Sequence, residues 1–322
     1  MTGPHASTTW LVGDIGGTNA RFGLVSPDGT LLHSRVLGDA DYPGIAEAIG
    51  AYLSDRGGLP RPRRGAIAIA SPVVDDEVRM TNHPWVFSIS GLRERLGFHR
   101  LAVINDFTAQ ALALPHLKEG DKAAIGGGAA QPGFPIGVLG PGSGLGVSGL
   151  IPAGKKWMPL AGEGGHATMA PYTDREGAAL RALRHHLDHV SAERVLSGPG
   201  LVNLYNALAE LDGVPARQYT AAQITDEATG NDDALCRETT EMFCAMLGTV
   251  AGNLALTLGA KGGVYIGGGI VPRLGERFAT SQFRERFMAK GRFRDYLAAI
   301  PTYVVTHPLP AFLGCAAALM EK

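Results

Sequence analysis

The sequence predicts an α/β protein of two domains, and three observations carry this prediction. The chain has 322 residues, and domains average roughly 150 residues, which favours two cores over one. Apolar strand-like segments alternate with segments whose apolar residues recur at helical spacing. Two strand–turn–strand units with glycine-rich first turns stand about half a chain apart, which indicates an internal structural duplication.

The first repeat opens the chain. Residues 8–15 and 20–25 read as strands on either side of a turn with the sequence GGTN, and a third strand follows at 30–37. A dinucleotide-binding Rossmann unit needs a helix after its glycine turn, so this order argues against that fold. A helix over 45–53 and a buried strand over 65–73 come next.

A further strand at 101–104 leads into a helix that begins near Phe107. Asn105 and Asp106 therefore stand at the carboxyl end of that strand.

The second half repeats the pattern. Residues 135–151 form an apolar strand, a glycine-rich turn and an alternating strand, and 155–162 is a third candidate strand. A small-residue helix over 248–260 and a buried strand over 262–266 follow, and a glycine turn then enters another helix. The pattern of each half of the sequence thus predicts a sheet with flanking helices.

Composition and charge exclude several classes of partner. Hydrophobic residues make up 45% and charged residues 18% of the chain, as in folded proteins. Lys and Arg number 29 against 30 for Asp and Glu, so no net basic field attracts nucleic acid, and we expect no nucleic-acid partner. No uninterrupted apolar run approaches the 18 or so residues that span a bilayer, and the first ten residues lack a signal-peptide pattern. We therefore expect no membrane partner and a cytoplasmic location.

The cysteines Cys236, Cys244 and Cys315 match no zinc or redox spacing. We expect them to be buried, reduced core residues.

The two glycine turns predict a phosphate site. One such turn reads as an ordinary hairpin, but two that oppose one another supply backbone N–H groups, without Cβ atoms, to both sides of a polyphosphate. Thr18 and Ser143 add hydroxyl donors. Asp14 either stabilises its turn or holds Mg²⁺ directly or through water. The candidate nucleotide-binding residues of these turns are Gly13, Asp14, Ile15, Gly16, Gly17 and Thr18 in the first and Gly142, Ser143 and Gly144 in the second.

A third glycine cluster, Gly267, Gly268 and Gly269, lies between a buried strand and a helix. Glycines there let an adenine ring or a ribose approach the backbone near a helix N-terminus. The P-loop pattern of phosphate-binding enzymes is absent from the sequence.

Polar side chains that suit a hydroxylated ligand form a second group. Asp106 either caps the helix that follows it or accepts a hydroxyl proton during phosphoryl transfer, as its position at a strand's carboxyl end favours. Glu163 and His166 lie in a glycine-rich loop, and Glu193 follows a charged helical stretch. The alternative interpretations are that His166 is a structural core histidine and that Glu193 is a surface helix residue. With Asn105, these residues offer neutral donors and ionised acceptors that match a polyol.

With these residues in hand, the chain resembles the bacterial glucokinase family, the branch of the hexokinase and actin-like ATPase superfamily outside the ROK proteins. Six motifs occur in the family's order. They are the phosphate motifs GDIGGTNAR and GPGSGLG, the catalytic segment INDFTA, the sugar segments GEGGH and SAERVLSGPGLVNLY, and the adenosine motif GGVYIGGGIVPR.

The resemblance implies a two-domain actin-like ATPase (ribonuclease H-like) fold with the active site in the interdomain cleft. It implies ATP-dependent transfer of the γ-phosphoryl group to the 6-hydroxyl of glucose, with Mg²⁺, by a cytoplasmic homodimer. Carried across by motif, Asp106 is the general base, and sugar hydroxyls are held by Asn105, Glu163, His166 and Glu193. Pro141 and Ser143 stand where the family often has Ala and Thr, which keeps the hydroxyl and stiffens the turn. The ROK zinc motif is absent from the sequence, so no structural zinc is expected.

We expect the smaller domain to comprise residues 1–112 with 308–322, including a returning C-terminal helix, and the larger to comprise 113–307. Two alternatives stay open. One is a kinase for another hexose such as mannose or glucosamine, since side-chain placement decides which hydroxyl orientation fits. The other is an actin-like ATPase module without sugar kinase activity, which needs the phosphate turns alone and which Glu163, His166 and Glu193 disfavour.

Overall fold

The computed structural model describes residues 8–81, 83–230 and 233–320, and the chain divides into two compact units. One unit comprises Met1–Lys118 with His307–Lys322, and the other comprises Glu119–Thr306. The first boundary differs from the predicted position because the 3₁₀ helix Leu114–His116 continues directly from the helix that ends at Ala113. Residues 1–7, part of the stretch inspected for a signal peptide, lie outside the described residues.

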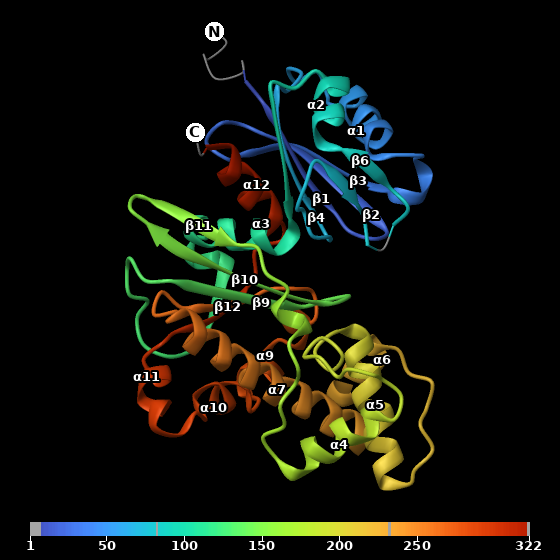
Figure 1. Cartoon of the computed structure of the whole chain (residues 1–322), viewed down its shortest axis with the longest axis vertical. Helices are drawn as coiled ribbons and strands as arrows, with labels where there is room; N and C mark the ends of the chain where they lie inside the picture. Colours follow the sequence, from blue (N-terminus) through green and yellow to red (C-terminus); the bar gives the residue numbers. More distant parts are fainter. Residues whose placement is uncertain (1–7, 82, 231–232, 321–322) are drawn as a thin grey trace. The chain divides into compact units, whose positions relative to one another are not determined.

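The first unit is built on a mixed sheet in the order β3-β2-β1-β4-β7 (Figure 1). β1, β4 and β7 run parallel, whereas β2 and β3 extend the sheet as antiparallel neighbours. The predicted strands are all present with slightly shifted ends. The bounds are Trp10–Ile15 for β1, Asn19–Val25 for β2, Leu31–Gly38 for β3, Arg64–Ile69 for β4 and Arg100–Asn105 for β7.

A small hairpin of β5 (Glu77–Arg79) and β6 (Val86–Ser88) accompanies this sheet. The sequence analysis does not predict it, because three residues are too few to display an alternation of apolar and polar side chains.

Alternate residues along the strands of the first unit face two different layers of helices. Leu11 and Ile67 pack in one core with α1 (Ile45–Ser54) and α2 (Ile89–Leu96). Smaller side chains on the other face, among them Val12 and Ala66, pack against α3 and α12. Figure 1 shows α1 and α2 on one side of these strands and α3 and α12 on the other. The bounds of the latter are Asp106–Ala113 and Pro310–Met320.

The C-terminal helix α12 packs closely on α3. A Cβ added at Gly314 of α12 would lie 1.7 Å from the carbonyl oxygen of Ala109 in α3. Only glycine permits this approach, because a methyl group would overlap that backbone. The predicted returning helix is thus present and braces the helix that begins at Asp106.

The second unit repeats the sheet arrangement in the order β11-β10-β9-β12-β13-β8. β9, β12 and β13 are parallel, and β10 and β11 extend the sheet antiparallel from β9 as β2 and β3 do from β1. The two units therefore confirm the predicted duplication. The bounds are Lys122–Gly126 for β8, Ile136–Pro141 for β9, Leu145–Ala153 for β10, Lys156–Leu160 for β11, Val264–Ile266 for β12 and Thr302–Val305 for β13.

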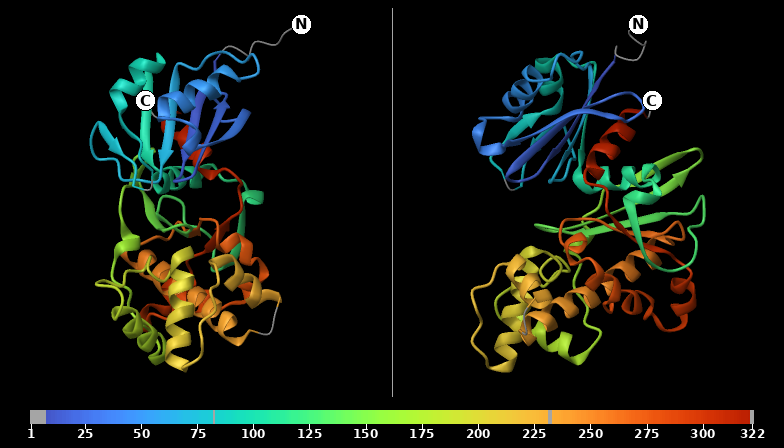
Figure 2. Two further views of the ribbon diagram at one scale, coloured as in Figure 1. Left: turned by 90° about the vertical axis from the view of Figure 1, so that its right-hand side faces the viewer. Right: turned by 180° about the vertical axis from the view of Figure 1, so that it is seen from behind.

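The longest helix described in the second unit is α7, which runs from Ala234 to Leu258 and packs against α5, α6, α10 and α11. Figure 2 gives two further views of the yellow and orange helices α5, α6 and α7, which pack on one another. The remaining bounds are Asp174–Arg184 for α4, Gly198–Asp212 for α5, Ala221–Gly230 for α6, Val271–Leu274 for α8, Glu276–Thr280 for α9, Phe283–Met288 for α10 and Arg294–Ala298 for α11.

Within the described ranges, α7 is the one helix long and apolar enough to cross a membrane, with a mean hydropathy of 1.4 over its most apolar window. The search for uninterrupted apolar runs missed this helix because polar residues such as Thr249 and Asn253 interrupt it. Inside the second unit, 61% of the window is buried. Its apolar character is accounted for by burial in the core, where Phe243 and Met246 are fully buried.

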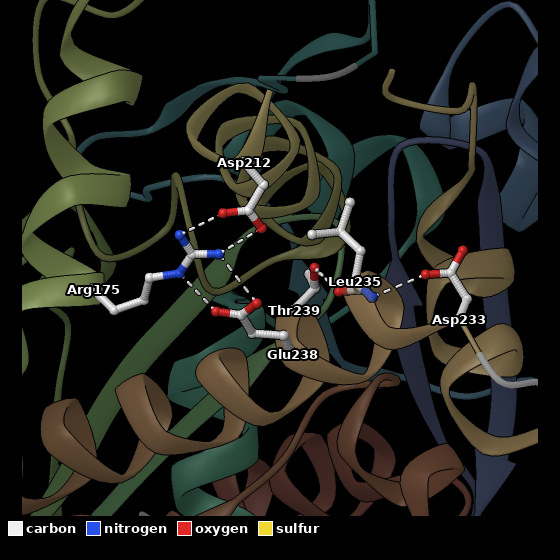
Figure 3. Close-up of polar contacts among 6 residues, drawn as sticks. All are labelled: Arg175, Asp212, Asp233, Leu235, Glu238 and Thr239. Carbon is white, nitrogen blue, oxygen red and sulfur yellow. Dashed lines mark hydrogen bonds and ion pairs between the residues drawn. The ribbon is translucent and has the colours of Figure 1, made fainter. Parts of the chain in front are cut away.

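An ion-pair network joins three helices of the second unit (Figure 3). Arg175 of α4 donates two hydrogen bonds of 2.8 Å to Asp212 at the end of α5. It also contacts Glu238 of α7 at 2.8 and 3.2 Å. Paired donation by a planar guanidinium fixes the relative orientation of the helices it joins.

All three cysteines are buried, and none of them forms a disulfide within the described residues, as expected. Burial raises the pKa of the Cys244 and Cys315 thiols to about 12. Such thiols are protonated and inert as nucleophiles at neutral pH.

Candidate active site

The first glycine turn connects β1 to β2 and is held by a hydrogen bond from a residue outside the turn. The N–H of Asp39 donates to the carbonyl of Thr18 over 3.1 Å. Gly13 and Ile15 are buried strand residues that pair with both β2 and β4. Gly17 and Thr18 are exposed, and they are the part of the turn that a phosphate can reach.

Asp14 is held by an arginine across the hairpin. Asp14 and Arg21 are direct partners in the β1–β2 register, and an Arg21 Nη1 lies 3.2 Å from the Asp14 Oδ2. The Asp14 side chain is 26% exposed. Burial raises the pKa of this carboxyl, and the charge of Arg21 opposes the rise.

The carboxyl ends of the parallel strands bring Asp14 and Asp106 to the same edge of the sheet. Ile15 of β1 is level with Ile69 of β4, which in turn is level with Asn105 of β7. Because Asp14 and Asp106 adjoin this row, their charges influence one another. Their spacing along the chain gave no reason to place the two residues together, and the family resemblance alone assigned them to one active site.

Asn105, and not Asp106, caps helix α3. The Asn105 Oδ1 accepts hydrogen bonds from the N–H groups of Phe107 at 2.8 Å and Thr108 at 3.2 Å. Its amide nitrogen points to the Ser71 carbonyl at the longer distance of 3.5 Å. The capping role considered for Asp106 is therefore taken by its neighbour, and the Asn105 amide N–H groups are the part of that side chain that a ligand can use.

Asp106 is the first residue of α3 and combines a partly buried carboxylate with a local donor. Its Oδ1 accepts a hydrogen bond from the Phe107 N–H at 2.9 Å. The pKa of Asp106 is raised to about 6, because burial and the charge of Asp14 raise it by more than the Phe107 hydrogen bond lowers it. A carboxylate whose pKa lies close to neutrality can accept a proton and release it again, as a general base must.

The second glycine turn connects β9 to β10 and is bonded to Glu193. The N–H of Gly142 donates to the carbonyl of Gly144 at 2.8 Å. The N–H of Leu145, directly after the turn, donates to the Glu193 Oε2 at 2.9 Å. Ser143 at the tip is exposed, so its hydroxyl is accessible to a ligand.

The loop of Glu163 and His166 lies against β10. Gly164–His166 forms a 3₁₀ helix, and a Cβ at Gly165 would lie 2.0 Å from the Leu145 carbonyl oxygen. The Gly165 carbonyl accepts a hydrogen bond of 2.8 Å from the N–H of Glu193. Glu163, His166, Glu193 and the second turn are thus brought together within one unit.

The sequence left two interpretations open for each of His166 and Glu193, and the structure excludes one of the two in both cases. His166 is exposed, which excludes a core histidine, and Glu193 lies half-buried in a turn, which excludes a surface helix residue. Both side chains are available to a ligand.

The third glycine cluster follows β12 and lies beside the second turn. Gly268 has a φ of +77°, and a Cβ there would lie 2.3 Å from the Pro141 carbonyl oxygen. The N–H of Gly267 donates to the Leu139 carbonyl at 2.8 Å. Packing against the end of β9 therefore demands glycine at 268, whereas Gly269 faces open space and is the residue that leaves room for a ligand.

A sequence model of the family described as Glucokinase matches residues 11–322. The chain belongs to the glucokinase family. The glucokinase of Paramagnetospirillum magneticum is 56% identical over 307 residues, which cover 95% of this chain and 96% of that protein. The glucokinase of Aromatoleum aromaticum is 53% identical over 310 residues, with coverage of 96% and 94%.

A solved structure of a glucokinase is also similar to this chain. A crystal structure of glucokinase from an Antarctic psychrotroph matches with a TM-score of 0.89 at 38% identity, covering 98% of this chain and 99% of that chain. The resemblance drawn from the six motifs is confirmed, as is the α/β actin-like ATPase fold. As a member of the glucokinase family, the chain is a transferase of the kinase type.

The sequence analysis did not identify Arg21 as a residue of the candidate site, although it pairs with Asp14. A signal for it exists, because a hairpin that turns at 16–19 pairs residue 15 with residue 20 and residue 14 with residue 21. The backbone donor of Leu145, which binds Glu193, has no such signal, since the two residues are far apart in the chain.

Proposed function

We propose that this chain is a glucokinase that transfers the γ-phosphoryl group of ATP to the 6-hydroxyl of D-glucose and so supplies glucose 6-phosphate to glycolysis. The observation that carries the proposal is Asp106, a partly buried carboxylate at a strand's carboxyl end with a pKa raised to about 6. The names of relatives that share more than half of their residues with this chain support the choice of sugar.

In the proposed reaction, Asp106 accepts the proton of the sugar 6-hydroxyl as its oxygen attacks the γ-phosphorus. The bond between that phosphorus and the bridging oxygen breaks, and ADP leaves with the electron pair. The other sugar hydroxyls are held by the Asn105 amide, the carboxylates of Glu163 and Glu193, and the His166 imidazole. Fixing the sugar in this way supplies the orientation on which phosphoryl transfer depends.

We assign ATP to the glycine turns. The exposed Thr18 and Ser143 hydroxyls and the turn amides suit phosphate oxygens, and Gly269 leaves room for the adenosine.

The residues present also fit Mg²⁺. In the described residues no group of three or more His, Cys, Asp or Glu side chains could hold a metal, but Mg²⁺ needs only one or two carboxylates besides phosphates and water. Asp14 offers such a carboxylate, because Arg21 engages only its Oδ2. When bound, Mg²⁺ neutralises charge that develops on the phosphates.

We further propose a cytoplasmic homodimer without nucleic-acid or membrane partners. The near balance of 29 basic and 30 acidic residues supports the absence of a polyanionic partner. The dimer and the location are supported by the family resemblance of the motifs.

The deciding experiment is a coupled assay with glucose and Mg-ATP on the wild type and on Asp106→Asn. Asparagine keeps the size and the acceptor for the Phe107 N–H but cannot take up a proton. We expect kcat to fall by about 10²- to 10⁴-fold while glucose still binds in an intrinsic-fluorescence titration. Asp55→Asn is the control, because Asp55 is a surface carboxylate with 66% of its side chain exposed. A kcat for Asp106→Asn close to that of the wild type would refute the base assignment.

A further inference from the structure

Glu193 contacts the two groups of residues that the proposed function treats as separate. Its Oε2 accepts the Leu145 N–H at the end of the second glycine turn, and its backbone N–H bonds to the loop of Glu163 and His166 through Gly165. In the described part of the chain, the Glu193 Oε1 has no hydrogen-bond partner. One carboxylate thus has an oxygen on the nucleotide turn and an oxygen available to a sugar hydroxyl.

The backbone around Glu193 is held firmly enough to transmit a displacement. The buried Ser197 donates from its Oγ to the Glu193 carbonyl at 2.8 Å and accepts from the Gly200 N–H at 3.0 Å. The N–H of Gly198, the first residue of α5, donates to the Gly142 carbonyl at 2.8 Å. The segment from Glu193 to Gly198 is therefore bonded to the second turn at both of its ends.

We propose that Glu193 couples sugar binding to the second glycine turn, and that Gly144, a residue of the nucleotide turn, controls sugar affinity through it. The inference rests on the proposed function, since it assigns glucose and ATP to these residues. A sugar hydroxyl bonded to Oε1 fixes the carboxylate, and the carboxylate fixes the Leu145 amide. Each ligand then prepares the site for the other, and the coupling is reciprocal.

Gly144 is the position at which this coupling can be tested. A Cβ at residue 144 would lie 2.5 Å from the Glu193 Oε2, so alanine must push the carboxylate away from its place. Gly120 lies in the same unit but outside the residues assigned to either ligand, and a Cβ there would meet nothing within 4 Å. Neither glycine has a left-handed φ, so alanine fits the backbone at both positions. Gly144→Ala therefore displaces the Glu193 carboxylate, whereas Gly120→Ala makes the same change of residue without that contact.

The experiment measures glucose binding to the full chain by calorimetry without nucleotide. We expect Gly144→Ala to weaken glucose binding by about tenfold, as for a disturbed hydrogen bond to a charged group, and Gly120→Ala to bind as the wild type does. In a Glu193→Ala background, Gly144→Ala should cause no further loss. Unchanged affinity in Gly144→Ala, or an equal loss in both glycine variants, overturns the inference. A wild type that binds no glucose refutes the proposed function instead.

A second arm covers the case in which Gly144→Ala does not fold, as judged by its thermal unfolding. Glu193→Asp withdraws the carboxylate from Leu145 by one methylene, so we expect weaker binding of a non-hydrolysable ATP analogue with Mg²⁺ as well as of glucose. Glu163→Asp is the matched control, because Glu163 is exposed and its side chain makes no hydrogen bond to the turn in the described ranges of the chain. It should weaken glucose binding alone. Equal nucleotide affinity in the two variants contradicts the coupling.

Discussion

At the scale of single residues, Asp106 differs from an ordinary surface carboxylate in two ways. It is partly buried at the start of α3, and the charge of Asp14 disfavours its ionised form. Both conditions follow from its place at the carboxyl edge of the sheet. They make Asp106 a better proton acceptor than a solvated aspartate, whose ordinary pKa is 3.8.

The first residue-scale prediction is a pH profile. Because only the ionised form of Asp106 can accept a proton, kcat/KM should be constant above its pKa of about 6 and fall about tenfold per pH unit below it. The measurement is kcat/KM for glucose at saturating Mg-ATP, with a parallel check that the protein stays folded. A profile that remains flat well below pH 5 would exclude Asp106 as the titrating base.

Asp39 gives a second prediction at this scale. Its carboxylate is fully buried, and neither oxygen has a hydrogen-bond partner among the residues that the structure describes. Burial raises the pKa of Asp39, and the nearby His83 lowers it by less. We expect Asp39→Asn to increase the free energy of unfolding by about 1–3 kcal/mol near pH 8, because it removes a buried, unsatisfied charge.

The sign of the pH dependence follows from the direction of the shift. A carboxyl whose pKa is raised by folding destabilises the native state above that pKa, and the penalty disappears as pH falls toward the unfolded value of 3.8. Urea unfolding at high and low pH should therefore show a gap between wild type and Asp39→Asn that closes on acidification. The exposed neighbour Asp41 provides the control, since Asp41→Asn should change stability by no more than about 0.5 kcal/mol. A gap that widens toward low pH would contradict the argument.

At the scale of elements, the position of Asp106 depends on how α12 braces α3. The contact is a backbone approach in which a Cβ at Gly314 would lie 1.7 Å from the Ala109 carbonyl oxygen. Backbone cannot yield as a flexible side chain can, so an added methyl group must separate the two helices. The start of α3, which carries Asp106, would move with them.

We therefore expect Gly314→Ala to lower the free energy of unfolding by about 1–3 kcal/mol and to reduce kcat. Gly50 is the control, because it lies inside α1 and a Cβ there would meet nothing within 4 Å. Gly50→Ala should stabilise the protein by about 0.5–1 kcal/mol through helix propensity. Denaturant unfolding and steady-state kinetics on both variants test this, and equal stability changes of the same sign would disprove it.

At the scale of the whole molecule, two units with matching sheets each offer one glycine turn, β1–β2 in the first and β9–β10 in the second. The first unit adds Asp106 at its sheet edge, and the second adds Glu163, His166 and Glu193. Duplication thus accounts for the two glycine turns, while the residues to which we assign the base and the sugar contacts are additions specific to each unit.

The hexose that this molecule prefers can be tested on its global stability. A ligand that binds only the folded state stabilises it by about 2.7 kcal/mol at one hundred times its Kd. We expect glucose to raise the thermal unfolding midpoint more than mannose or glucosamine at equal concentration, and to give the highest kcat/KM. A larger shift with either of the other hexoses would identify a different substrate.

Much of this protein was determined locally by its sequence. Strand alternation, helical periodicity and glycine turns involve residues a few positions apart. The two strand–turn–strand units, their glycine turns and the place of Asp106 after a strand could therefore be predicted. The short strands β8 and β13 could not, because five and four residues carry little periodicity and become strands through their neighbours.

Tertiary structure alone decided the roles that depend on contacts between distant residues. It gave the cap of α3 to Asn105, set Arg21 against Asp14, and required glycine at 268 for packing against Pro141. It also bonded Glu193 to Leu145 across 48 positions of the chain. The physical reason is that a sequence pattern encodes which face of an element is apolar, whereas hydrogen bonds and pKa shifts depend on distances that exist only once the elements have packed.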